Sequence, residues 1–310
     1  MTLNLTFAST RYVHQVTDRL LTCVGVCVDP LANKNVIYWA RDAIVTLGYT
    51  GLAYLEGIPT DQWLAESLAD FTFDRSGRFR TFIRCGPLPQ WRDIGLSVKC
   101  LCEKLQTALK RARSETFEII IAGWQWGRRE RTRPIIWSVS YPDGKGGAET
   151  TRLPRRWYMP MRTKLGATPG GNISDQDFRE VAARLPAQSA DEVEAALVHG
   201  IRLTANKNCL VGPHCISIGL PDPKRRLEVR VRYIPLGFQT AVVTGGGRTL
   251  EVPAAFSPWV VGQSLIAPPL ILVGGRTELH MGPFTVLLEA PDNVSKVWAM
   301  SSNYKPSSGA

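Results

Sequence analysis

Three residues near the start of the chain have types and spacings that suit a nucleophilic reaction. Thr2 follows the initiator methionine, Asp18 lies sixteen residues after Thr2, and Lys34 lies sixteen residues after Asp18. A threonine hydroxyl is a poor nucleophile at pH 7 and needs an adjacent base. A small second residue such as Thr permits removal of the initiator methionine. The freed α-amine, whose ordinary pKa is about 8, can then serve as that base within Thr2 itself.

The segment around these residues resembles the proteasome β subunits and the related bacterial peptidases of the N-terminal nucleophile (Ntn) hydrolase superfamily. Residues 17–22 (TDRLLT) and the pair Asn33-Lys34 carry the resemblance. In that family a terminal threonine, an acid after an Ala or Thr residue, and a lysine that opens the third strand stand at these same intervals. The resemblance covers about residues 2–234 and is most specific before residue 23.

The resemblance implies a role for each residue in the hydrolysis of a peptide or amide substrate. Lys34 would lie against the Thr2 hydroxyl, where its positive charge favours the alkoxide. Asp18 would hold Lys34 in place and offset the cost of its burial, because a lone buried charge is expensive. Thr22 would pair its backbone with an extended substrate, and Arg19 would support the site from a second layer. The resemblance also implies a homo-oligomer.

Two glycines are candidates for the backbone N–H that would stabilise the oxyanion. Gly48 lies fourteen residues beyond Lys34, which is the interval found in the family. Gly51, in the stretch Tyr49-Thr50-Gly51, fits the local pattern of the family better. Both stay candidates at this point.

The chain departs from the family pattern around the last helix. The family usually carries an Asp and a Ser near the turn after that helix, and this chain has Asn208 and Val211 there. Asn208 can still form hydrogen bonds as a supporting residue, whereas the Val211 side chain cannot. The Ser-Gly pair before the third helix of the family is replaced by something like residues 170–172 (GGN). Altered support of this kind fits a changed substrate, weak activity, or a catalytically inactive scaffold or assembly protein.

Hydrophobic periodicity and turn residues predict the elements that must position these residues. We expect strands within residues 3–7, 12–17, 35–39 and 43–48, helices within 60–71 and 93–113, strands within 117–122 and 134–141, two further helices after 174 and 189, and strands within 215–220 and 227–234. Thr60-Asp61, Ser174 and Ser189 are the expected caps, and Ser189-x-x-Glu192 has the form of a capping box. This order, with the resemblance, predicts an α+β fold: a four-layer αββα sandwich of the proteasome-like Ntn type.

The expected organisation is one layered domain with a C-terminal extension. Residues 143–172 are rich in Gly, Pro and Arg and are expected to form a loop. From about residue 237, Gly and Pro separate short apolar runs. We therefore expect an Ntn-hydrolase-like domain at residues 1–235, a β-rich extension at 236–300, and a disordered tail at 301–310.

Composition narrows the class of protein. The 310 residues are 44% hydrophobic and 21% charged, as in ordinary globular chains. No signal peptide or membrane-spanning stretch is visible, so a cytoplasmic location is expected. The seven cysteines and four histidines lack the spacing of a metal site, and the chain lacks a Gly-rich phosphate loop. We expect no metal and no cofactor.

The net charge of +10 offers a third hypothesis, an anionic partner. Four arginines crowd the link between two expected strands: Arg128, Arg129, Arg131 and Arg133. Trp124 and Trp126 are adjacent, and basic residues with aromatics can bind single-stranded nucleic acid. A solvated turn or a subunit interface explains the same composition. Nucleic-acid binding is thus the least favoured of the three functions.

Overall fold

The computed structural model is a mixed α/β structure rich in strands, with two large sheets and four helices in the part of the chain that it describes. The described residues are 2–23, 26–29, 32–72, 92–112, 116–127, 132–142, 149–151, 166–171, 173–185, 189–223, 228–236, 240–245, 248–253, 255–262, 266–269, 271–272, 276–281 and 284–289.

The first large sheet carries the N-terminal strand near its edge. Its strand order is β12-β1-β2-β13-β14-β22-β21. The strands are β1 (Asn4–Ala8), β2 (Tyr12–Asp18), β12 (Gly166–Gly170), β13 (Cys215–Pro221), β14 (Glu228–Ile234), β21 (Arg276–Met281) and β22 (Phe284–Glu289). Neighbouring strands are antiparallel except β14 and β22, which are parallel.

The second large sheet carries the strand that follows Lys34. Its order is β11-β10-β9-β6-β5-β18-β19. The strands are β5 (Asn35–Ala40), β6 (Ala43–Thr50), β9 (Thr116–Trp126), β10 (Thr132–Pro142), β11 (Glu149–Thr151), β18 (Trp259–Val261) and β19 (Ile266–Ala267). Here the pair β5 and β18 is parallel.

Eight short strands form four separate antiparallel pairs. They are β3 (Leu21–Cys23) with β4 (Val26–Asp29), β7 (Tyr54–Leu55) with β8 (Ile58–Pro59), β15 (Thr240–Gly245) with β16 (Arg248–Pro253), and β17 (Ala255–Phe256) with β20 (Ile271–Leu272).

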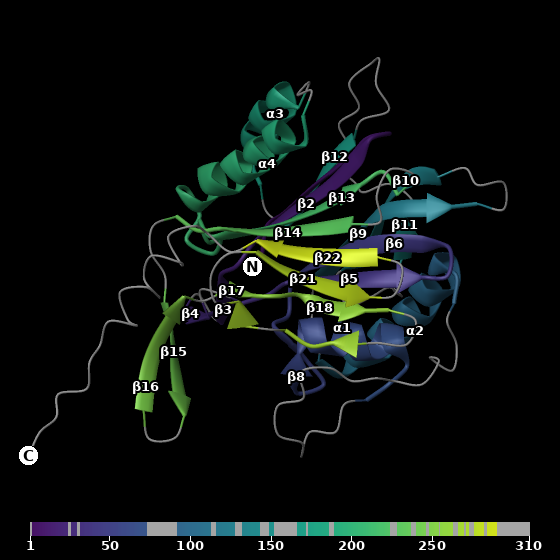
Figure 1. Cartoon of the computed structure of the whole chain (residues 1–310), viewed down its shortest axis with the longest axis horizontal. Coiled ribbons are helices and arrows are strands. Elements are labelled where there is room, and N and C mark those ends of the chain that lie inside the picture. The colour runs from purple at the N-terminus through teal and green to yellow at the C-terminus, as the bar shows by residue number, and fades with distance from the viewer. Residues whose placement is uncertain are drawn as a thin grey trace, which may run out of the picture.

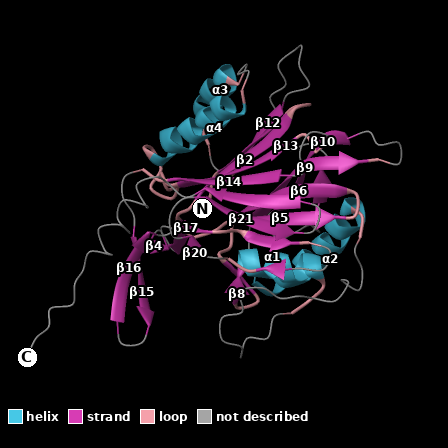
Figure 2. Cartoon of the chain, viewed as in Figure 1, coloured by secondary structure: helices cyan, strands magenta, loops and turns pink. Residues whose placement is uncertain are grey.

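The helices lie in two pairs at opposite sides of the strands, as Figures 1 and 2 show. The pairs are α1 (Thr60–Ala69) with α2 (Ile94–Ala112), and α3 (Asp175–Arg184) with α4 (Ala190–Ala205). One apolar core joins α1 and α2 to the second sheet, and another joins α3 and α4 to β1 and β2. The apolar residues of helix α2 lie along one of its faces. That face packs on the first of these cores, against the second sheet. Each helix pair therefore packs against a different sheet.

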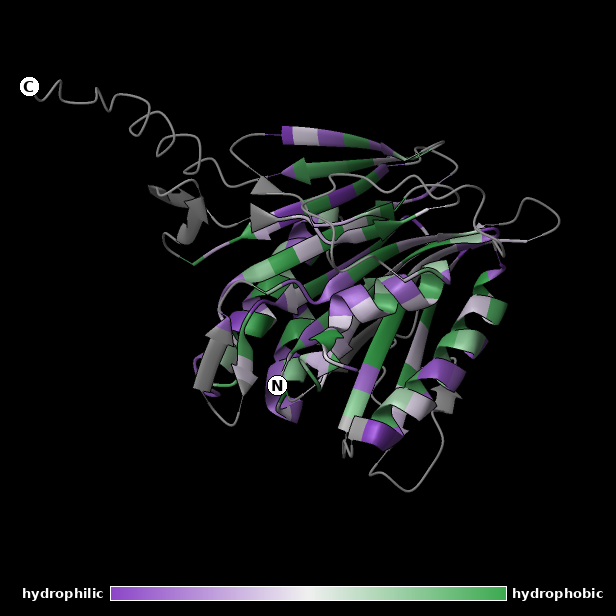
Figure 3. Ribbon diagram, turned by 90° about the horizontal axis from the view of Figure 1, so that it is seen from below, coloured by the Kyte–Doolittle hydropathy of each residue, from purple (hydrophilic) through white to green (hydrophobic). Residues whose placement is uncertain are grey.

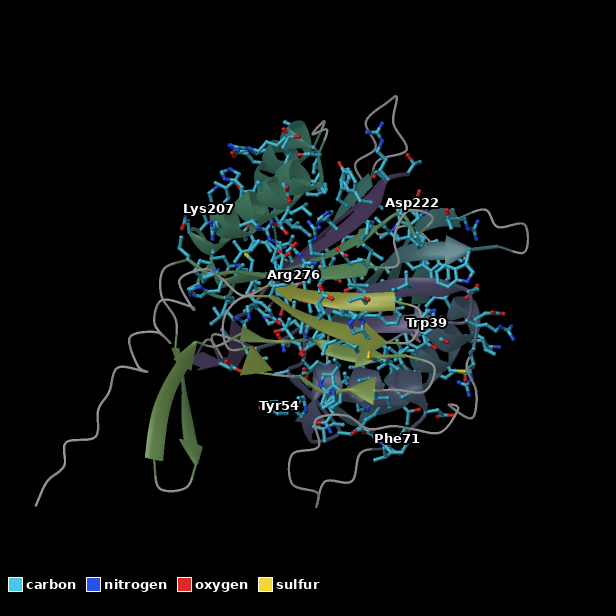
Figure 4. The ribbon with its side chains drawn as sticks, in the orientation of Figure 1. Trp39, Tyr54, Phe71, Lys207, Asp222 and Arg276 are labelled. Atoms are coloured by element: carbon cyan, nitrogen blue, oxygen red, sulfur yellow. The ribbon has the colours of Figure 1, made fainter. Side chains whose placement is uncertain are left out.

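A third apolar core contains residues from both large sheets, such as Ile37 and Ile120 from the second and Ile216 and Val231 from the first. Figure 3 shows green, hydrophobic stretches on the strands, with purple and pale residues among them. Near the start of β1 this core gives way to buried amides and hydroxyls. The Gln15 side chain donates to Thr6 Oγ1 and to the Ile120 carbonyl, and it accepts from Asn35 and Thr46. Buried polar groups that satisfy one another in this way fix the register of neighbouring strands.

Several expected boundaries are confirmed and some are wrong. Ser174 caps α3, and Ser189 and Glu192 form the reciprocal capping box of α4. Thr60 does not cap α1, because it is already the first helical residue and its hydroxyl donates to the Leu52 carbonyl. The loop expected at residues 143–172 in fact contains β11 and β12. The composition of β12 (GATPG) did not predict a strand, because glycine and proline are rare in strands. The strand can form because it lies at the edge of the sheet, where these residues are tolerated.

The strands beyond residue 236 continue both large sheets. β22 lies beside β14, and β18 lies beside β5. The expected domain boundary at residue 235 stays a prediction. Two strands that follow it, β18 and β22, pair with β5 and β14, which precede it. Within the described ranges, no helix has the length and hydrophobicity needed to cross a bilayer.

Candidate active site around Thr2

Strand pairing at one end of the first sheet brings Thr2 and Asp18 together. β1 and β2 are antiparallel, with Asn4 opposite Thr17. Beyond that pair, the Asp18 N–H donates to the Leu3 carbonyl over 3.0 Å, and the Leu3 N–H donates to Asp18 Oδ1 over 2.6 Å. Asp18 therefore holds the residue after Thr2 through both its backbone and its side chain.

The Asp18 carboxylate has no exposed surface and accepts four hydrogen bonds. Oδ1 accepts from the Leu3 N–H, and Oδ2 accepts from the N–H groups of Leu20 and Gly212, both over 3.1 Å. The fourth donor is Lys34 Nζ, also at 3.1 Å from Oδ2. The four donors come from separate segments of the chain, so this carboxylate ties those segments together at the site.

Lys34 is the second charge of the site and is 1% exposed. Its ammonium donates to Asp18 and to the Leu20 carbonyl. Burial lowers the pKa of Lys34 because it removes water from the ammonium, and the charge and hydrogen bond of Asp18 act in the opposite direction. The Lys34 carbonyl accepts from the Tyr49 N–H over 3.2 Å, which ties the start of β5 to β6.

Thr2 is 4% exposed and is enclosed by two further elements. The Thr50 hydroxyl, at the end of β6, donates to the Thr2 carbonyl over 3.0 Å. Gly171, directly after β12, has φ +99°, and a Cβ at this position would lie 1.9 Å from the Thr2 carbonyl oxygen. Only glycine fits there, because the backbone conformation and the close approach both exclude a side chain.

The two glycine candidates occupy different environments. Gly48 lies inside β6, opposite Asn35 on one side and Ile120 on the other. Tyr49 directs its N–H to β5, so the alternation of an antiparallel strand directs the Gly48 N–H to β9. Gly51 lies just beyond the strand, next to Thr50, with φ +117°.

Arg19 and Thr22 lie on the segment that follows Asp18. Arg19 is buried, with its guanidinium 5.3 Å from the centre of the Tyr233 ring. Burial lowers the pKa of Arg19. The Arg19 N–H donates to the His214 carbonyl, which ties this turn to the segment before β13. Thr22 lies in β3, paired with Cys27 of β4.

The turn after α4 supports Asp18 through its backbone. Asn208 Oδ1 accepts from the Leu210 N–H, so this side chain is used within the turn. Val211 is buried. The next residue, Gly212, donates to Asp18, and a Cβ on Gly212 would lie 2.6 Å from Leu20 Cβ.

Thr50, Gly171 and Gly212 also contribute to the site, although the sequence pattern predicts no role for them. The pair Gly170-Gly171 stands out in the sequence, but the close approach of Gly171 to Thr2 joins segments far apart along the chain. Gly212 gave only the weak signal of a glycine before a proline, and Thr50 gave none. Each acts through a contact between segments that are far apart in sequence.

The basic link offers little support for nucleic-acid binding where it can be seen. Arg128, Arg129 and Arg131 lie outside the described residues. Arg133 is exposed and donates to Gln125, while Trp124 is buried and donates to the Leu220 carbonyl. Trp124 therefore presents no face for stacking on a base. Among the residues that are described, no group of His, Cys, Asp and Glu side chains could hold a metal ion.

Comparisons with known proteins give structural neighbours only. No protein-family model matches the chain, and no curated protein matches its sequence. The eukaryotic HslV from Trypanosoma brucei aligns with 71% of this chain and 99% of its own, at 16% identity and a TM-score of 0.41. Anbu, the ancestral beta-subunit, from Yersinia bercovieri aligns with 71% of this chain and 81% of its own, at 10% identity and a TM-score of 0.46. A Gly-1 mutant of Anbu from Hyphomicrobium sp. strain MC1 aligns with 71% and 82%, at 14% identity and a TM-score of 0.45.

The chain is thus similar to these HslV and Anbu structures at 10–16% identity. The resemblance is of low identity, and the roles proposed below rest on the contacts around Thr2 rather than on these alignments.

Proposed function

We propose that the chain is an amide hydrolase of the peptidase class, whose nucleophile is the hydroxyl of Thr2 after removal of Met1. The observation that carries this proposal is the buried Lys34–Asp18 ion pair, whose carboxylate also binds the backbone directly after Thr2. A buried ion pair adds little stability compared with apolar residues of similar volume. Its position beside a threonine that can become N-terminal gives it a use in catalysis.

The proposed reaction has two steps, with a covalent ester between them. The Thr2 hydroxyl oxygen attacks the substrate carbonyl carbon, and the hydroxyl proton passes to the Thr2 α-amine. The C–N bond then breaks, and the leaving amine takes that proton. Water then attacks the ester carbonyl carbon and gives a proton to the Thr2 α-amine. The bond from that carbon to Thr2 Oγ1 breaks, the acid leaves, and Oγ1 takes the proton back from the α-ammonium.

Lys34 and Asp18 set the electrostatics of this cycle. The Lys34 ammonium stabilises the developing alkoxide, and it also lowers the pKa of the Thr2 α-ammonium because like charges repel. Asp18 keeps Lys34 charged and in place. Gly51 is the proposed oxyanion donor, because it lies outside the ladder of β6 and next to Thr50, which binds the Thr2 carbonyl. We propose that Thr22 in β3 aligns an extended substrate.

The proposed architecture is the four-layer αββα sandwich, with α1 and α2 outside one sheet and α3 and α4 outside the other. The three cores, one between each helix pair and its sheet and one shared by both sheets, support it. We also propose a homo-oligomer, for which a mass measurement in solution by multi-angle light scattering is the test. A monomer at micromolar concentration would contradict this part.

Intact mass and covalent labelling test the catalytic proposal. We expect the purified chain to lack Met1 and a threonine-directed β-lactone or epoxyketone to label one residue per chain. Thr2→Ala should abolish labelling. Thr107→Ala is the matched control, because Thr107 lies on α2 and its hydroxyl donates to the Glu103 carbonyl of the same helix. Retention of Met1, or equal labelling of Thr2→Ala, would rule out this chemistry.

A second candidate, an inactive scaffold of the same fold, is favoured by the turn after α4. The Asn208 side-chain oxygen accepts a hydrogen bond from the Leu210 N–H, and the Val211 side chain has no polar group. This candidate predicts that Thr2→Ala leaves both assembly and biological function intact, and that wild type is not labelled.

A further inference from the structure

The segment before β18 lies against the residue that precedes Lys34. β18 runs parallel to β5, with Trp259 opposite Val36. Two residues earlier, the carbonyl of Ser257 accepts a hydrogen bond of 2.7 Å from Asn33 Nδ2. Ser257 has no exposed surface and Asn33 is half-buried, so this bond is partly buried.

Asn33 and Lys34 are held from the opposite side by β6. The Tyr49 N–H donates to the Lys34 carbonyl, and the Tyr49 hydroxyl lies 3.4 Å from the Asn33 carbonyl. The backbone that carries the Lys34 side chain is therefore fixed between β6 and the segment that leads into β18.

β18 is itself anchored to the helix layer. Trp259 is buried and its side chain donates to the carboxylate of Asp61, in the first turn of α1. Asp61 is buried as well. A buried anchor of this kind leaves the segment before β18 little freedom to move.

We propose that the segment from Ser257 to β18 is a positioning element for Lys34 and that Asn33 is the residue through which it acts. The inference rests on the proposed function, because Lys34 matters for catalysis only if Thr2 is the nucleophile. The Lys34 ammonium stands at the end of a four-carbon side chain, so a small change in the backbone moves it relative to Asp18 and the Leu20 carbonyl, its partners at the site. Displacements of about 1 Å can cost about a hundredfold in rate.

The test compares two variants that each remove one hydrogen bond from a side chain to a backbone carbonyl. Asn33→Ala removes the bond to Ser257. Trp126→Phe removes the bond from Trp126 Nε1 to the Arg41 carbonyl, at the other end of the same sheet. The rate of labelling by the β-lactone is measured from pH 5 to 9, together with hydrogen exchange of the amides of β5.

We expect Asn33→Ala to label about tenfold more slowly at pH 7, a smaller loss than the roughly hundredfold cost of a full 1 Å displacement. Its pH profile should also shift to higher pH, because a more distant Lys34 no longer lowers the pKa of the Thr2 amine. Exchange at the start of β5 should become faster. Trp126→Phe should leave all three unchanged.

The outcomes separate the inference from the proposed function. Equal rates and equal pH profiles for Asn33→Ala and wild type overturn the inference while the function stands. Failure of wild type to be labelled refutes the function, and unchanged exchange in β5 of Asn33→Ala then overturns the positioning role as well. A rate loss without a shift of the profile would mean a general loss of structure and would also overturn it.

Discussion

Asp18 joins groups from four parts of the chain in one buried carboxylate. Its partners come from the start of β1, the turn after β2, the start of β5 and the turn before β13. Such a group is costly to alter, because removing one member leaves the others without a partner.

Replacing Asp18 by Asn should destabilise the protein by about 3–5 kcal/mol, because the Lys34 charge stays buried without its partner. Labelling of Thr2 should be lost. Urea unfolding at a fixed protein concentration measures the change in free energy. The double variant Asp18→Asn with Lys34→Met should recover much of the stability and none of the labelling. A stable and fully labelled Asp18→Asn would contradict the role of the ion pair.

A second prediction at this scale concerns the glycine against Thr2. Gly171→Ala should cost about 1–3 kcal/mol and slow labelling, since φ is +99° and the added carbon overlaps the Thr2 carbonyl. Gly95→Ala is the control, because Gly95 lies in α2 and a Cβ there meets nothing within 4 Å. That change should stabilise the protein by up to about 1 kcal/mol. Equal effects of the two changes on the urea midpoint would refute the close approach.

At the scale of elements, the sequence predicted those helix ends and strands that depend on residues close together in the chain. The capping box of α4 was readable because Ser189 and Glu192 stand three residues apart and bind each other's backbone. The hydrophobic pattern also predicted β1, β2, β5 and β6. Thr2, Asp18 and Lys34 lie at or next to the ends of these strands.

Contacts between distant segments were not readable in the same way. Nothing near residue 257 indicates that its carbonyl faces Asn33, because that pairing depends on β18 joining the edge of β5. Asn4 and Thr6 alternate with apolar residues, a pattern typical of a strand with one face exposed to solvent. They are buried, because the second sheet covers that face and Gln15 satisfies Thr6.

The capping box gives a prediction for α4. Ser189→Ala should cost about 0.5–2 kcal/mol, because the Glu192 N–H loses its acceptor. Glu192→Gln should have little effect, since Gln can also bind the N–H of Ser189. Urea midpoints of the two variants measure the difference. Equal losses would mean that charge near the helix N-terminus, rather than the box, provides the stability.

At the scale of the whole molecule, two buried groups give opposite pH dependences. Burial raises the pKa of Asp61 to about 7 and lowers the pKa of His14 to about 4. The Asp61 contribution to stability is full below its unfolded pKa and is lost as pH rises to about 7. The His14 contribution is full above its unfolded pKa of 6.5 and is lost as pH falls to about 4.

Separate variants should expose each of these trends. Relative to wild type, Asp61→Asn should gain stability as pH rises from 4 to 7, by up to about 1.4 kcal/mol per pH unit. His14→Gln should lose stability relative to wild type over the same rise, up to pH 6.5. Urea unfolding at several pH values measures both differences. Parallel curves for wild type and both variants would show that neither group titrates differently on folding.

Asp18 depends on the backbone of Gly212, and Asn33 depends on that of Ser257. A ribosome makes about 5–20 residues per second, so these partners leave it roughly 10–50 s after Thr2. Thr2 is thus made well before the groups that order its surroundings exist. Under the proposed function, a nascent chain would have no ordered site for cleavage until the segment around Ser257 has left the ribosome.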